Sequence, residues 1–270
     1  MAALLVTSSG VVHAGDDPLA AEDAYRQKLF ERIAPSVVFI SNGQGFGSGF
    51  IVDKEGVILT NAHVVGKAQT VAIVLHDGRR AEGTVTERGA DNTDLALVKI
   101  PLKNLPTLAL GNSDDLRVGA WAGSVGHGRG AIWTFNTGII SNIYPSGHER
   151  PVFQTQIPLN PGSSGGPIFN RRGVVVGVVT AGITDSNSIN FGIQIDVAYR
   201  TLNGLSKLCD CLVVEAPKGV PIFIDGKMAG KGPRVAVKVE KGVHEVFAVI
   251  NGKMQKQKLA FPAMRHVVLK

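Results

Sequence analysis

Three residues that lie far apart in the sequence have the types needed to activate a serine for attack on a carbonyl. Ser164 lies in the glycine-rich segment 162–167, and His63 and Asp94 precede it in the chain. A serine hydroxyl is a poor nucleophile at neutral pH. It becomes a good one when an imidazole takes its proton and a buried carboxylate fixes the tautomer of that imidazole. The sequence therefore predicts a nucleophile, a general base and an orienting acid.

The glycines beside Ser164 predict a site for the negative oxygen that such an attack creates. Gly162 allows a turn in which its N–H and that of Ser164 point at one spot, forming an oxyanion hole. Loss of one such donor typically lowers kcat by ~10²–10³. Gly165 and Gly166 leave room for the imidazole and the substrate chain. The alternative interpretation of this segment is a glycine-rich turn between two strands.

The choice of His63 and Asp94 depends on their surroundings. His63 follows directly on the expected strand 57–60. Its rivals among the seven histidines lie in expected turns beside Gly or Asp: His76, His127 and His148. Asp94 is preferred to Asp91 because the apolar residues after it should draw its carboxylate into the protein, where it needs a partner. The alternative for either aspartate is a turn or strand-start residue. The order His, Asp, Ser is that of the chymotrypsin-like arrangement, not of subtilisin or the α/β-hydrolases.

The elements that must position these residues are mostly short strands. Val and Ile occur in short runs broken by Gly, Asn and Asp, and 33 residues are glycine, a pattern typical of an all-β protein. One helix is expected at 18–33, where Pro35 ends it, and a closing helix at 197–205. Strands are expected at 36–41, 48–52, 57–60, 70–75, 81–87, 94–100, 120–125, 137–143, 154–157, 173–180 and 190–195. About a dozen such strands favour two packed β-barrels.

The 270 residues are enough for one large domain, or for one large and one small domain. Residues 216–270 hold 11 Lys and Arg against 3 Asp and Glu, a net charge of +8, whereas the first 215 residues carry −2. This break in charge indicates a break in domain. We expect an N-terminal segment at 1–23, the main domain at 24–205, a linker at 206–216 and a basic β-domain at 217–270.

Other features of the chain exclude some classes of function. No stretch reaches the ~18 apolar residues that a membrane span needs. A disulfide between the two cysteines, Cys209 and Cys211, would be strained, and a metal site there would need more ligands nearby. We therefore expect no metal and no cofactor, and we assign the cysteines no function.

The first residues only partly resemble an export signal. An apolar run at 2–6 is followed by a small-x-small site at 12–14, but a basic start and a longer apolar core are missing. The interpretations are a degenerate signal, a true start upstream of Met1, or a disordered tail. Export is favoured, which predicts a periplasmic or secreted protein.

At this point the chain resembles the HtrA (Deg-type) trypsin-like serine proteases over residues 24–205. The resemblance rests on G-S-G-F-I at 47–51, L-T-N-A-H at 59–63, D-L-A-L-V-K at 94–99, L-G-N-S at 110–113, L-R-V-G at 116–119, Q-T at 154–155 and N-P-G-S-S-G-G-P at 160–167. It implies a chymotrypsin-like double β-barrel, an endopeptidase with the triad His63, Asp94 and Ser164, and a role in protein quality control in the bacterial envelope. Protein or peptide substrates and a homo-oligomer are implied as well.

The chain departs from the family pattern at several positions. Ser163 stands where the family usually has Asn, and Q-I-P-L at 156–159 replaces D-A-A-I. In trypsin the place six residues before the serine holds an acid, and here it is Pro158, so cleavage after small or medium aliphatic residues is expected. By resemblance, Val179, Thr180 and Ile193 should line the cleft with Pro158. The family typically carries a PDZ domain after the protease, whereas the tail here is short and has another pattern, and no zymogen cleavage is expected.

The basic tail resembles a PEGA domain, a β-module of bacterial envelope proteins. The matching residues are V-P-I-F-I-D-G-K at 220–227, G-K-G-P at 230–233 and K-G-V-H at 241–244. Its charge has two interpretations: contact with an anionic envelope surface, or a solvated face on a spacer domain. Its three phenylalanines, Phe223, Phe247 and Phe261, lie in apolar strand-like contexts, which argues against binding of single-stranded nucleic acid.

Two functions of different classes remain from the sequence. The first is an active serine endopeptidase. The second is an inactive protease fold that serves as a binding module, tethered to an anionic surface by its basic tail. The presence of all three triad residue types favours the first.

Overall fold

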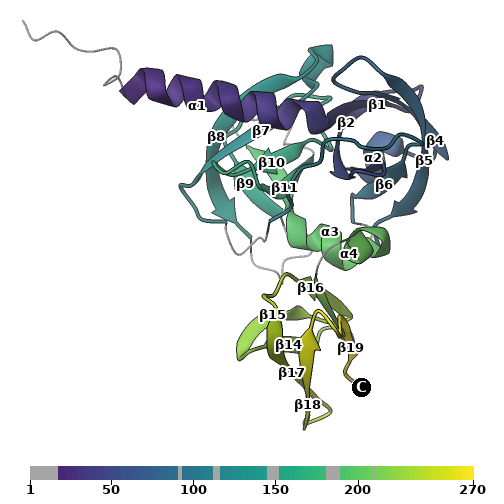
Figure 1. The fold of residues 1–270 in the computed structure, drawn as a ribbon, viewed down its shortest axis with the longest axis vertical. Coiled ribbons are helices and arrows are strands. Elements are labelled where there is room, and N and C mark those ends of the chain that lie inside the picture. The colour runs from purple at the N-terminus through teal and green to yellow at the C-terminus, as the bar shows by residue number, and fades with distance from the viewer. Residues whose placement is uncertain (1–17, 91–92, 112–115, 145–151, 181–188, 209–210) are drawn as a thin grey trace, which may run out of the picture.

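The computed structural model of the chain describes residues 18–90, 93–111, 116–144, 152–180, 189–208 and 211–270 (Figure 1). The export signal expected near the N-terminus lies outside these residues. Helix α1 (Pro18–Ile33) has the predicted bounds. Its C-terminal turns bury Leu29 and Ile33 in the core, and the short 3-10 helix η1 (Ala34–Ser36) follows with Pro35 in its first turn.

The first barrel contains six antiparallel strands. They are β1 (Val37–Ser41), β2 (Phe46–Asp53), β3 (Val57–Thr60), β4 (Thr70–Val74), β5 (Arg80–Arg88) and β6 (Ala96–Lys99). The sheet closes in the order β1-β2-β3-β6-β5-β4. The barrel is filled by aliphatic side chains such as Ile40, Ile51, Ile58 and Val98, each fully buried. The short helix α2 (Ala62–Val65) follows β3 directly.

The second barrel repeats this arrangement. Its strands are β7 (Trp121–Gly126), β8 (Thr134–Ile143), β9 (Val152–Thr155), β10 (Pro167–Phe169), β11 (Val175–Thr180) and β12 (Asn190–Gln194). They close in the order β10-β11-β12-β9-β8-β7, which is the strand order of the first barrel over again. The short 3-10 helix η3 (Gly128–Gly130) lies between β7 and β8. The predicted all-β, chymotrypsin-like double barrel is confirmed, and β10 is the one barrel strand that the sequence pattern missed.

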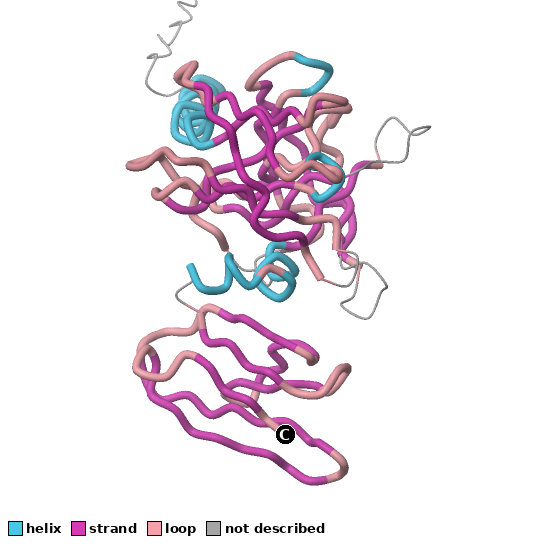
Figure 2. The backbone as a smooth tube through the Cα atoms, turned by 90° about the vertical axis from the view of Figure 1, so that its right-hand side faces the viewer, coloured by secondary structure: helices cyan, strands magenta, loops and turns pink. Residues whose placement is uncertain are grey.

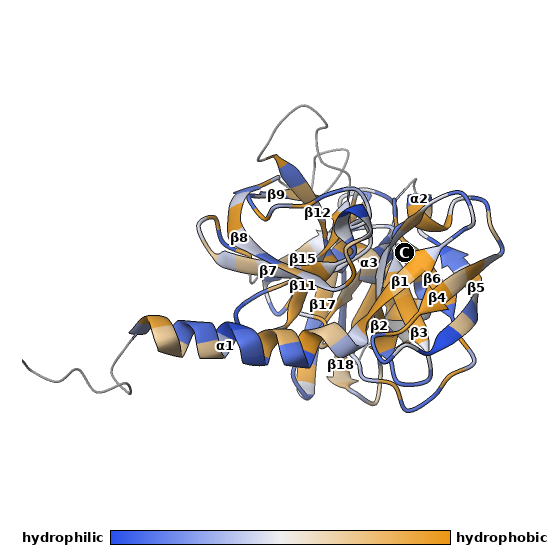
Figure 3. Ribbon diagram, turned by 90° about the horizontal axis from the view of Figure 1, so that it is seen from above, coloured by the Kyte–Doolittle hydropathy of each residue, from blue (hydrophilic) through white to orange (hydrophobic). Residues whose placement is uncertain are grey.

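The apolar residues are concentrated in the barrel strands, whereas α1 alternates polar and apolar turns (Figure 3). One core cluster joins the two barrels, because it includes Phe50 and Leu97 from the first and Phe169 and Val178 from the second. The two barrels are therefore packed as one unit, and the seam between them is the place where residues from both can meet. No helix among the described residues is both long and apolar enough to cross a membrane.

The closing helix of the sequence prediction is two helices, α3 (Ile195–Thr201) and α4 (Asn203–Leu208). The break comes at Leu202, whose side chain is fully buried. The carboxylate of Glu87 on β5 accepts hydrogen bonds from Asn203 N at 2.6 Å and Gly204 N at 2.7 Å. A carboxylate at this position satisfies the free N–H groups that begin a helix, so α4 starts anew against the first barrel.

The C-terminal part is a small domain of two sheets. Its strands are β13 (Leu212–Glu215), β14 (Pro221–Ile224), β15 (Lys227–Lys231), β16 (Arg234–Val237), β17 (Gly242–Ile250), β18 (Lys253–Phe261) and β19 (His266–Val268). A three-stranded sheet, β16-β13-β19, packs with a four-stranded sheet, β15-β14-β17-β18 (Figure 2). Residues 212–215, which the sequence placed in a linker, are therefore the central strand of the smaller sheet.

Helices α3 and α4 lie between the barrels and this C-terminal domain (Figures 1 and 2). Val213 of β13 and Ala236 of β16 belong to the same core cluster as Val197 and Ala198 of α3. Cys211, just before β13, is buried and disulfide-bonded, which differs from the sequence expectation. The C-terminal domain is thus attached to the barrels through a shared apolar contact and not through the chain alone.

Candidate active site

His63 is held at the seam by the local structure that follows β3. Asn61 has extended backbone and begins α2, so His63 lies one residue inside this single-turn helix. The side chain of Asn61 donates to the carbonyl of Asp94 at 2.7 Å. Because Thr60 is paired with Ala96 between β3 and β6, the residues just beyond these strand ends are brought side by side. Strand pairing therefore places His63 next to Asp94.

Asp94 accepts hydrogen bonds at both carboxylate oxygens. His63 donates twice, from its backbone N to Oδ1 at 2.9 Å and from Nδ1 to Oδ2 at 2.7 Å. Thr180, at the end of β11 in the second barrel, donates its hydroxyl to Oδ2 at 3.0 Å. Since a carboxylate can only accept, Nδ1 of His63 carries a proton and Nε2 is left with a free lone pair. That is the tautomer a general base requires.

The same contacts set the charge of Asp94. Burial by itself would raise the pKa of this carboxyl, but the hydrogen bonds from His63 and from the hydroxyl of Thr180 together hold the pKa below its ordinary value. Hydrogen bonds to the ionised form favour that form. Asp94 is therefore a carboxylate at neutral pH, able to stabilise a positive charge on His63.

Ser164 reaches the seam from the second barrel. Its carbonyl accepts a hydrogen bond from the backbone N of Ser48 on β2 at 2.8 Å. The next residue, Gly165, has φ +84°, and a Cβ there would lie 2.4 Å from Thr60 Oγ1 and 3.2 Å from Asn61 N. Only glycine fits at this position, and its close approach sets the serine loop against the start of α2. The structure thus brings the loop of Ser164 to the segment that carries His63. Within the described residues, no hydrogen bond joins the Ser164 hydroxyl to His63.

Two backbone N–H groups of the serine loop are free, and they are the two that the sequence predicted as the oxyanion hole. Ser163 N donates to Asn160 O at 2.9 Å, and Gly165 N and Gly166 N donate to Val179 O and Ser163 O at 2.9 and 3.0 Å. By contrast, neither Gly162 N nor Ser164 N donates to any acceptor in the described part of the chain. This loop keeps its other N–H groups paired and leaves these two available.

The orientation of the Gly162 N–H follows from the carbonyl on the other side of the same peptide bond. The carbonyl of Pro161 accepts a hydrogen bond from Arg129 N at 2.7 Å. In a trans peptide the C=O and the N–H point in opposite directions, so the N–H of Gly162 points away from Arg129. Gly162 has φ +99°, and a Cβ there would lie 2.5 Å from the carbonyl oxygen of His127. A side chain at this position would displace the loop.

The residues predicted to bind substrate differ from one another in how exposed they are. Pro158 is exposed. The side chains of Val179 and Ile193 are 1% and 5% exposed and belong to the cores of the barrels, and Thr180 faces Asp94. Val179 also holds the serine loop, since its carbonyl and N–H pair with Gly165 and Gly166. A part for these residues in substrate binding stays a prediction.

The sequence did not predict the contacts that Thr180 and His127 make at the site. Thr180 was expected to face substrate, and its hydrogen bond to Asp94 joins residues 86 positions apart, which no local pattern reveals. His127 was set aside as a turn residue, yet it is fully buried behind the serine loop. The rivals Asp91 and His148 lie outside the described residues.

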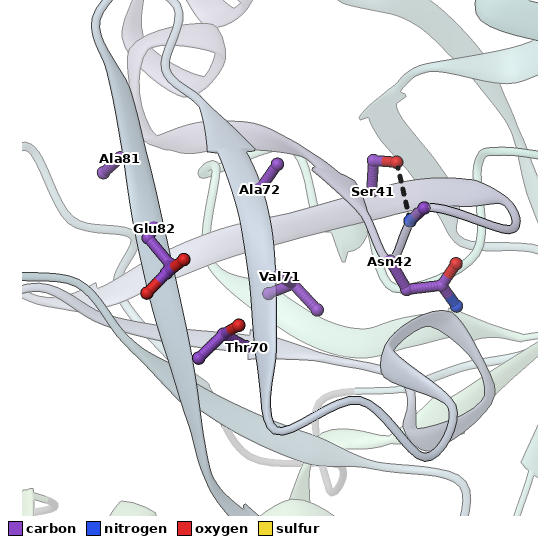
Figure 4. A pocket seen from close by; sticks show the side chains of 8 residues that line it. Ser41, Asn42, Thr70, Val71, Ala72, Ala81 and Glu82 are labelled. Carbon is purple, nitrogen blue, oxygen red and sulfur yellow. Dashed lines mark hydrogen bonds between the residues drawn. The ribbon is translucent and has the colours of Figure 1, made fainter.

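A pocket on the first barrel lies apart from the candidate triad. A pocket of about 290 Å³ on the first barrel is lined by Ser41, Asn42, Gly43, Thr70, Val71, Ala72, Ala81 and Glu82 (Figure 4). Gly43 N donates to Ser41 Oγ at 3.3 Å at its rim, and none of the three triad residues lines it. The part of the chain that the structure describes contains no cluster of three or more His, Cys, Asp or Glu suited to a metal ion.

Comparison with known proteins places this geometry in a family. Residues 47–178 match the sequence model of the trypsin-like peptidase domain. The chain is 41% identical over 215 residues to the putative serine protease HhoA of Synechocystis sp., covering 76% of this chain and 54% of that protein. It is 43% identical over 169 residues to a probable periplasmic serine endoprotease DegP-like of Halomonas elongata, covering 60% of this chain and 35% of that protein. The chain therefore spans about half or less of the length of these curated relatives.

Solved structures agree with the sequence matches. The crystal structure of Deg5 superposes with a TM-score of 0.56 at 34% identity, covering 66% of this chain and 91% of that one. The HtrA-type protease AlgW with a tripeptide has a TM-score of 0.60 at 24% identity over 87% of this chain and 96% of that one, which supports the fold alone. Since residues 47–178 match the trypsin-like domain and nearly the whole of Deg5 is matched at 34% identity, this chain belongs to the HtrA-type trypsin-like serine proteases.

Proposed function

We propose that this chain is a serine endopeptidase that cleaves proteins through an acyl-enzyme, with Ser164 as nucleophile, His63 as general base and Asp94 as orienting acid. The observation that supports this most strongly is the chain of hydrogen bonds from Thr180 through Asp94 to His63, because it joins the two barrels at the seam where the loop of Ser164 also lies.

In the proposed reaction, Ser164, His63 and Asp94 hydrolyse a peptide bond in two halves, acylation and deacylation. Nε2 of His63 takes the proton of the Ser164 hydroxyl while Oγ attacks the scissile carbonyl, and the oxygen that becomes negative is bound by Gly162 N–H and Ser164 N–H. The imidazolium then gives its proton to the leaving amine and the C–N bond breaks. Water, deprotonated by His63, then attacks the ester, and His63 returns that proton to Ser164 Oγ as the ester C–O bond breaks and the acid product leaves. Asp94 stabilises the imidazolium in both halves of the reaction.

The lack of a resting hydrogen bond between Ser164 and His63 is compatible with this mechanism. Catalytic hydrogen bonds are often long without substrate and tighten in the complex. His63 is about half exposed, with 48% of its side-chain surface accessible, so a bound peptide would cover the imidazole and bring the hydroxyl and Nε2 together.

The direct test is degradation of casein by the wild type beside Ser164→Ala. The proposal expects the variant to lose a factor of about 10⁴–10⁶ in kcat, and a fluorophosphonate probe to label the wild type at Ser164 only. Failure of the probe to label a folded wild type would leave the second candidate, an inactive protease fold used as a binding module.

For the substrate, we propose cleavage after small or medium aliphatic residues. Pro158, six residues before the nucleophile, provides no negative charge for a Lys or Arg side chain, and the fully buried Ile157 beside it is apolar. A peptide library should give aliphatic residues before the cut. A profile dominated by Lys or Arg would contradict the assignment.

For the setting, we propose protein quality control in the bacterial envelope, with the chain periplasmic or secreted and able to form homo-oligomers. Its support is the Halomonas relative, which is a probable periplasmic serine endoprotease. Fractionation of cells that express the native gene tests the location, and sedimentation velocity of the purified protein tests the assembly.

For the C-terminal domain, we propose a PEGA-like module that contacts an anionic surface. Its outward four-stranded face contains the stacked rings of Phe223 and Phe247, 4.8 Å apart, beside the exposed Met228 and Met254. On the edge strand β18, Lys256 and Lys258 lie across from Phe247 and Glu245. Lys256 is ion-paired with Glu245 at 2.8 Å, so these three charged side chains leave one net positive charge. Apolar and cationic groups on one face suit a layer of acidic head groups. Sedimentation with vesicles containing phosphatidylglycerol should fall with added salt, and equal binding to neutral vesicles would contradict the electrostatic part.

A further inference from the structure

One buried histidine has no part in the mechanism above. His127 is 0% exposed and lies directly behind the serine loop. Phe39 and Trp133 meet its ring edge to face, with centroids 5.4 and 5.0 Å away. Burial lowers the pKa of His127 to about 4, so its ring is neutral at physiological pH. A neutral buried imidazole must place one donor and one acceptor.

The ring and backbone of His127 both contact the hydroxyl of Ser48. Nδ1 lies 3.0 Å from Ser48 Oγ, and the backbone N of His127 donates to the same oxygen at 3.1 Å. That hydroxyl also lies 2.7 Å from the carbonyl oxygen of Gly162. Ser48 is itself fully buried, so these three contacts account for its hydroxyl.

The directions of these bonds follow from the number of protons. The carbonyl of Gly162 can only accept, so the single proton of the Ser48 hydroxyl goes there. The contact between Ser48 Oγ and His127 Nδ1 is then a hydrogen bond only if Nδ1 carries the proton of the ring. Nε2 is left as an unprotonated acceptor, and it has no partner among the described residues. A buried acceptor without a partner is tolerated because the alternative tautomer would bury an unpaired donor and also lose the bond to Ser48.

The hydrogen bonds from His127 to Ser48 and from Ser48 to Gly162 form a relay. This relay holds one of the two peptide planes that flank Gly162. The plane before Gly162 is held by Arg129 N on the carbonyl of Pro161 at 2.7 Å. The plane after it is held by the Ser48 hydroxyl on the carbonyl of Gly162. In this second plane Ser163 N also donates to Asn160 O at 2.9 Å. The second plane lies between the Gly162 N–H and the Ser164 N–H, and glycine has no side chain to restrict rotation between the planes, so the orientation of the second plane sets how the two free donors face one another. His127 acts on the second plane through Ser48 and lies two residues before Arg129, which holds the first.

We propose that His127 is a positioning residue for the oxyanion hole: as the Nδ1–H tautomer it holds the Ser48 hydroxyl on the Gly162 carbonyl, and so fixes the peptide plane that sets the Gly162 N–H and the Ser164 N–H against the same reacting oxygen. The inference rests on the proposed peptidase activity. The competing explanation is packing alone, with the ring filling space between Phe39 and Trp133. A phenyl ring would then serve as well, whereas the relay needs a donor at the position of Nδ1.

The test compares His127→Phe, which keeps the ring, with His127→Asn, whose amide can donate from the place of Nδ1. His127→Phe should lower kcat by about 10- to 100-fold, less than outright removal of a donor, with KM within about twofold. The inhibition constant of a peptide aldehyde, which forms the same tetrahedral oxyanion, should weaken by the same factor. His127→Asn should recover most of both. Equal activity of wild type and His127→Phe, or a loss confined to KM, would overturn the proposal.

Two further variants separate the relay from general damage. Ser48→Ala should reproduce the kcat loss of His127→Phe, and the double variant should lose little more than either, because both act through one contact. His76→Phe is the matched control, since exposed His76 also meets Trp133 edge to face at 5.0 Å, and its kcat should equal that of the wild type. Full additivity of the two single losses would count against the relay.

A measurement without catalysis keeps the inference testable if the variants do not fold or the chain proves inactive. Nitrogen-15 NMR of histidine-labelled wild type at neutral pH distinguishes the two neutral tautomers. His127 should be protonated at Nδ1 only, and a resonance pattern with the proton on Nε2 would overturn the relay. If instead this tautomer is found and no fluorophosphonate labels Ser164, then the peptidase function has failed while the hydrogen-bond relay stands.

Discussion

At the scale of single residues, the site depends on which atoms donate and which accept in its hydrogen bonds. Asp94 accepts from His63 twice and from Thr180 once, and Ser48 accepts from His127 while donating to Gly162. Each of these two groups joins two neighbours: Asp94 joins His63 to Thr180, and Ser48 joins His127 to Gly162. The side chains around the proposed triad therefore set the tautomer of His63 and, in our proposal, hold the peptide plane that follows Gly162.

The first prediction concerns Thr180. Thr180→Val keeps the shape of the side chain and removes the hydroxyl that donates to Asp94 Oδ2. A hydrogen bond to a charged group is worth about 1.5–3 kcal/mol, so kcat/KM should fall about tenfold or more as Asp94 orients His63 less well. Thr180→Ser should restore activity. A Val variant as fast as the wild type, measured on one peptide across pH, would show that the hydroxyl is dispensable.

The second prediction concerns stability in acid. The pKa of His127 is lowered by burial to about 4, against about 6.5 in an unfolded chain. Between these values the unfolded state binds more protons, so stability should fall as the pH drops from 6.5 to 4, by up to about 3 kcal/mol. His127→Asn should flatten this part of the profile in urea unfolding.

Two other groups act outside that window. The pKa of Asp94 is lowered below 3.8, so its contribution is lost only at lower pH. The pKa of His244 is raised by its hydrogen bond to Asp225, so its contribution is present below 6.5 and is lost as the pH rises through the raised value. An unchanged slope in His127→Asn would therefore point to a different group.

At the scale of elements, the serine loop is held by backbone contacts that only glycine permits. Gly165 has φ +84°, and a Cβ there would come within 2.1 Å of Ser48 O and 2.4 Å of Thr60 Oγ1. These contacts press the loop against β2 and β3. The hydroxyl of Thr60 in turn donates to Ser48 O at 2.7 Å, so the loop and the two strands form one packed layer.

The third prediction follows from this layer. Gly165→Ala adds both backbone strain and overlap with two oxygens, and should cost about 3 kcal/mol or more of unfolding free energy. Gly219→Ala is the matched control, because Gly219 has φ +80° with nothing within 4 Å of the added Cβ, and strain alone costs about 1 kcal/mol. Equal losses in the two variants, measured by chemical unfolding, would mean that the contacts to β2 and β3 add nothing.

The elements also show what the sequence could and could not predict. Helix α1 was predicted with its bounds because Pro35 ends a clear apolar repeat. Strand β10 was missed because its three residues follow two glycines and are too short to alternate. The break of the closing helix at Leu202 was missed because its cause, the carboxylate of Glu87, lies 116 residues away from Asn203.

The candidate site also contains residues that the sequence could indicate and contacts that it could not. Ser164, His63 and Asp94 could be chosen from residue type, order and neighbours. The contacts of Thr180 and His127 could not, because both arise when distant strands meet, 86 and 79 residues apart in the chain. His127 was even assigned to a turn from the glycine that follows it, and η3 does begin there, although the imidazole points into the core.

At the scale of the whole molecule, the small C-terminal domain and the barrels share a core. Val213 and Ala236 pack in one cluster with Ala198 of α3 and with Leu202 at the break between α3 and α4. The shared cluster should make unfolding of the two parts cooperative, since separation would expose apolar surface on both.

The fourth prediction uses the placement of the tryptophans. The chain has two, Trp121 and Trp133, and both lie in or beside the second barrel. Urea unfolding followed by their fluorescence should coincide with the transition followed by far-ultraviolet circular dichroism, which reports on all strands. Ala236→Asp, which puts a charge into the shared cluster, should split the two transitions. Separate transitions already in the wild type would mean that the domains unfold independently.

The identical strand order of the two barrels has a consequence for how the chain could be divided. Each barrel closes on itself without borrowing a strand from the other, yet His63 and Asp94 belong to one and Ser164 and Thr180 to the other. Neither half alone contains all of the residues proposed for catalysis. Two fragments cut between the barrels should each be inactive and should hydrolyse peptides only after they reassociate. The rate of peptide hydrolysis would then measure the fraction of fragments that have reassociated correctly.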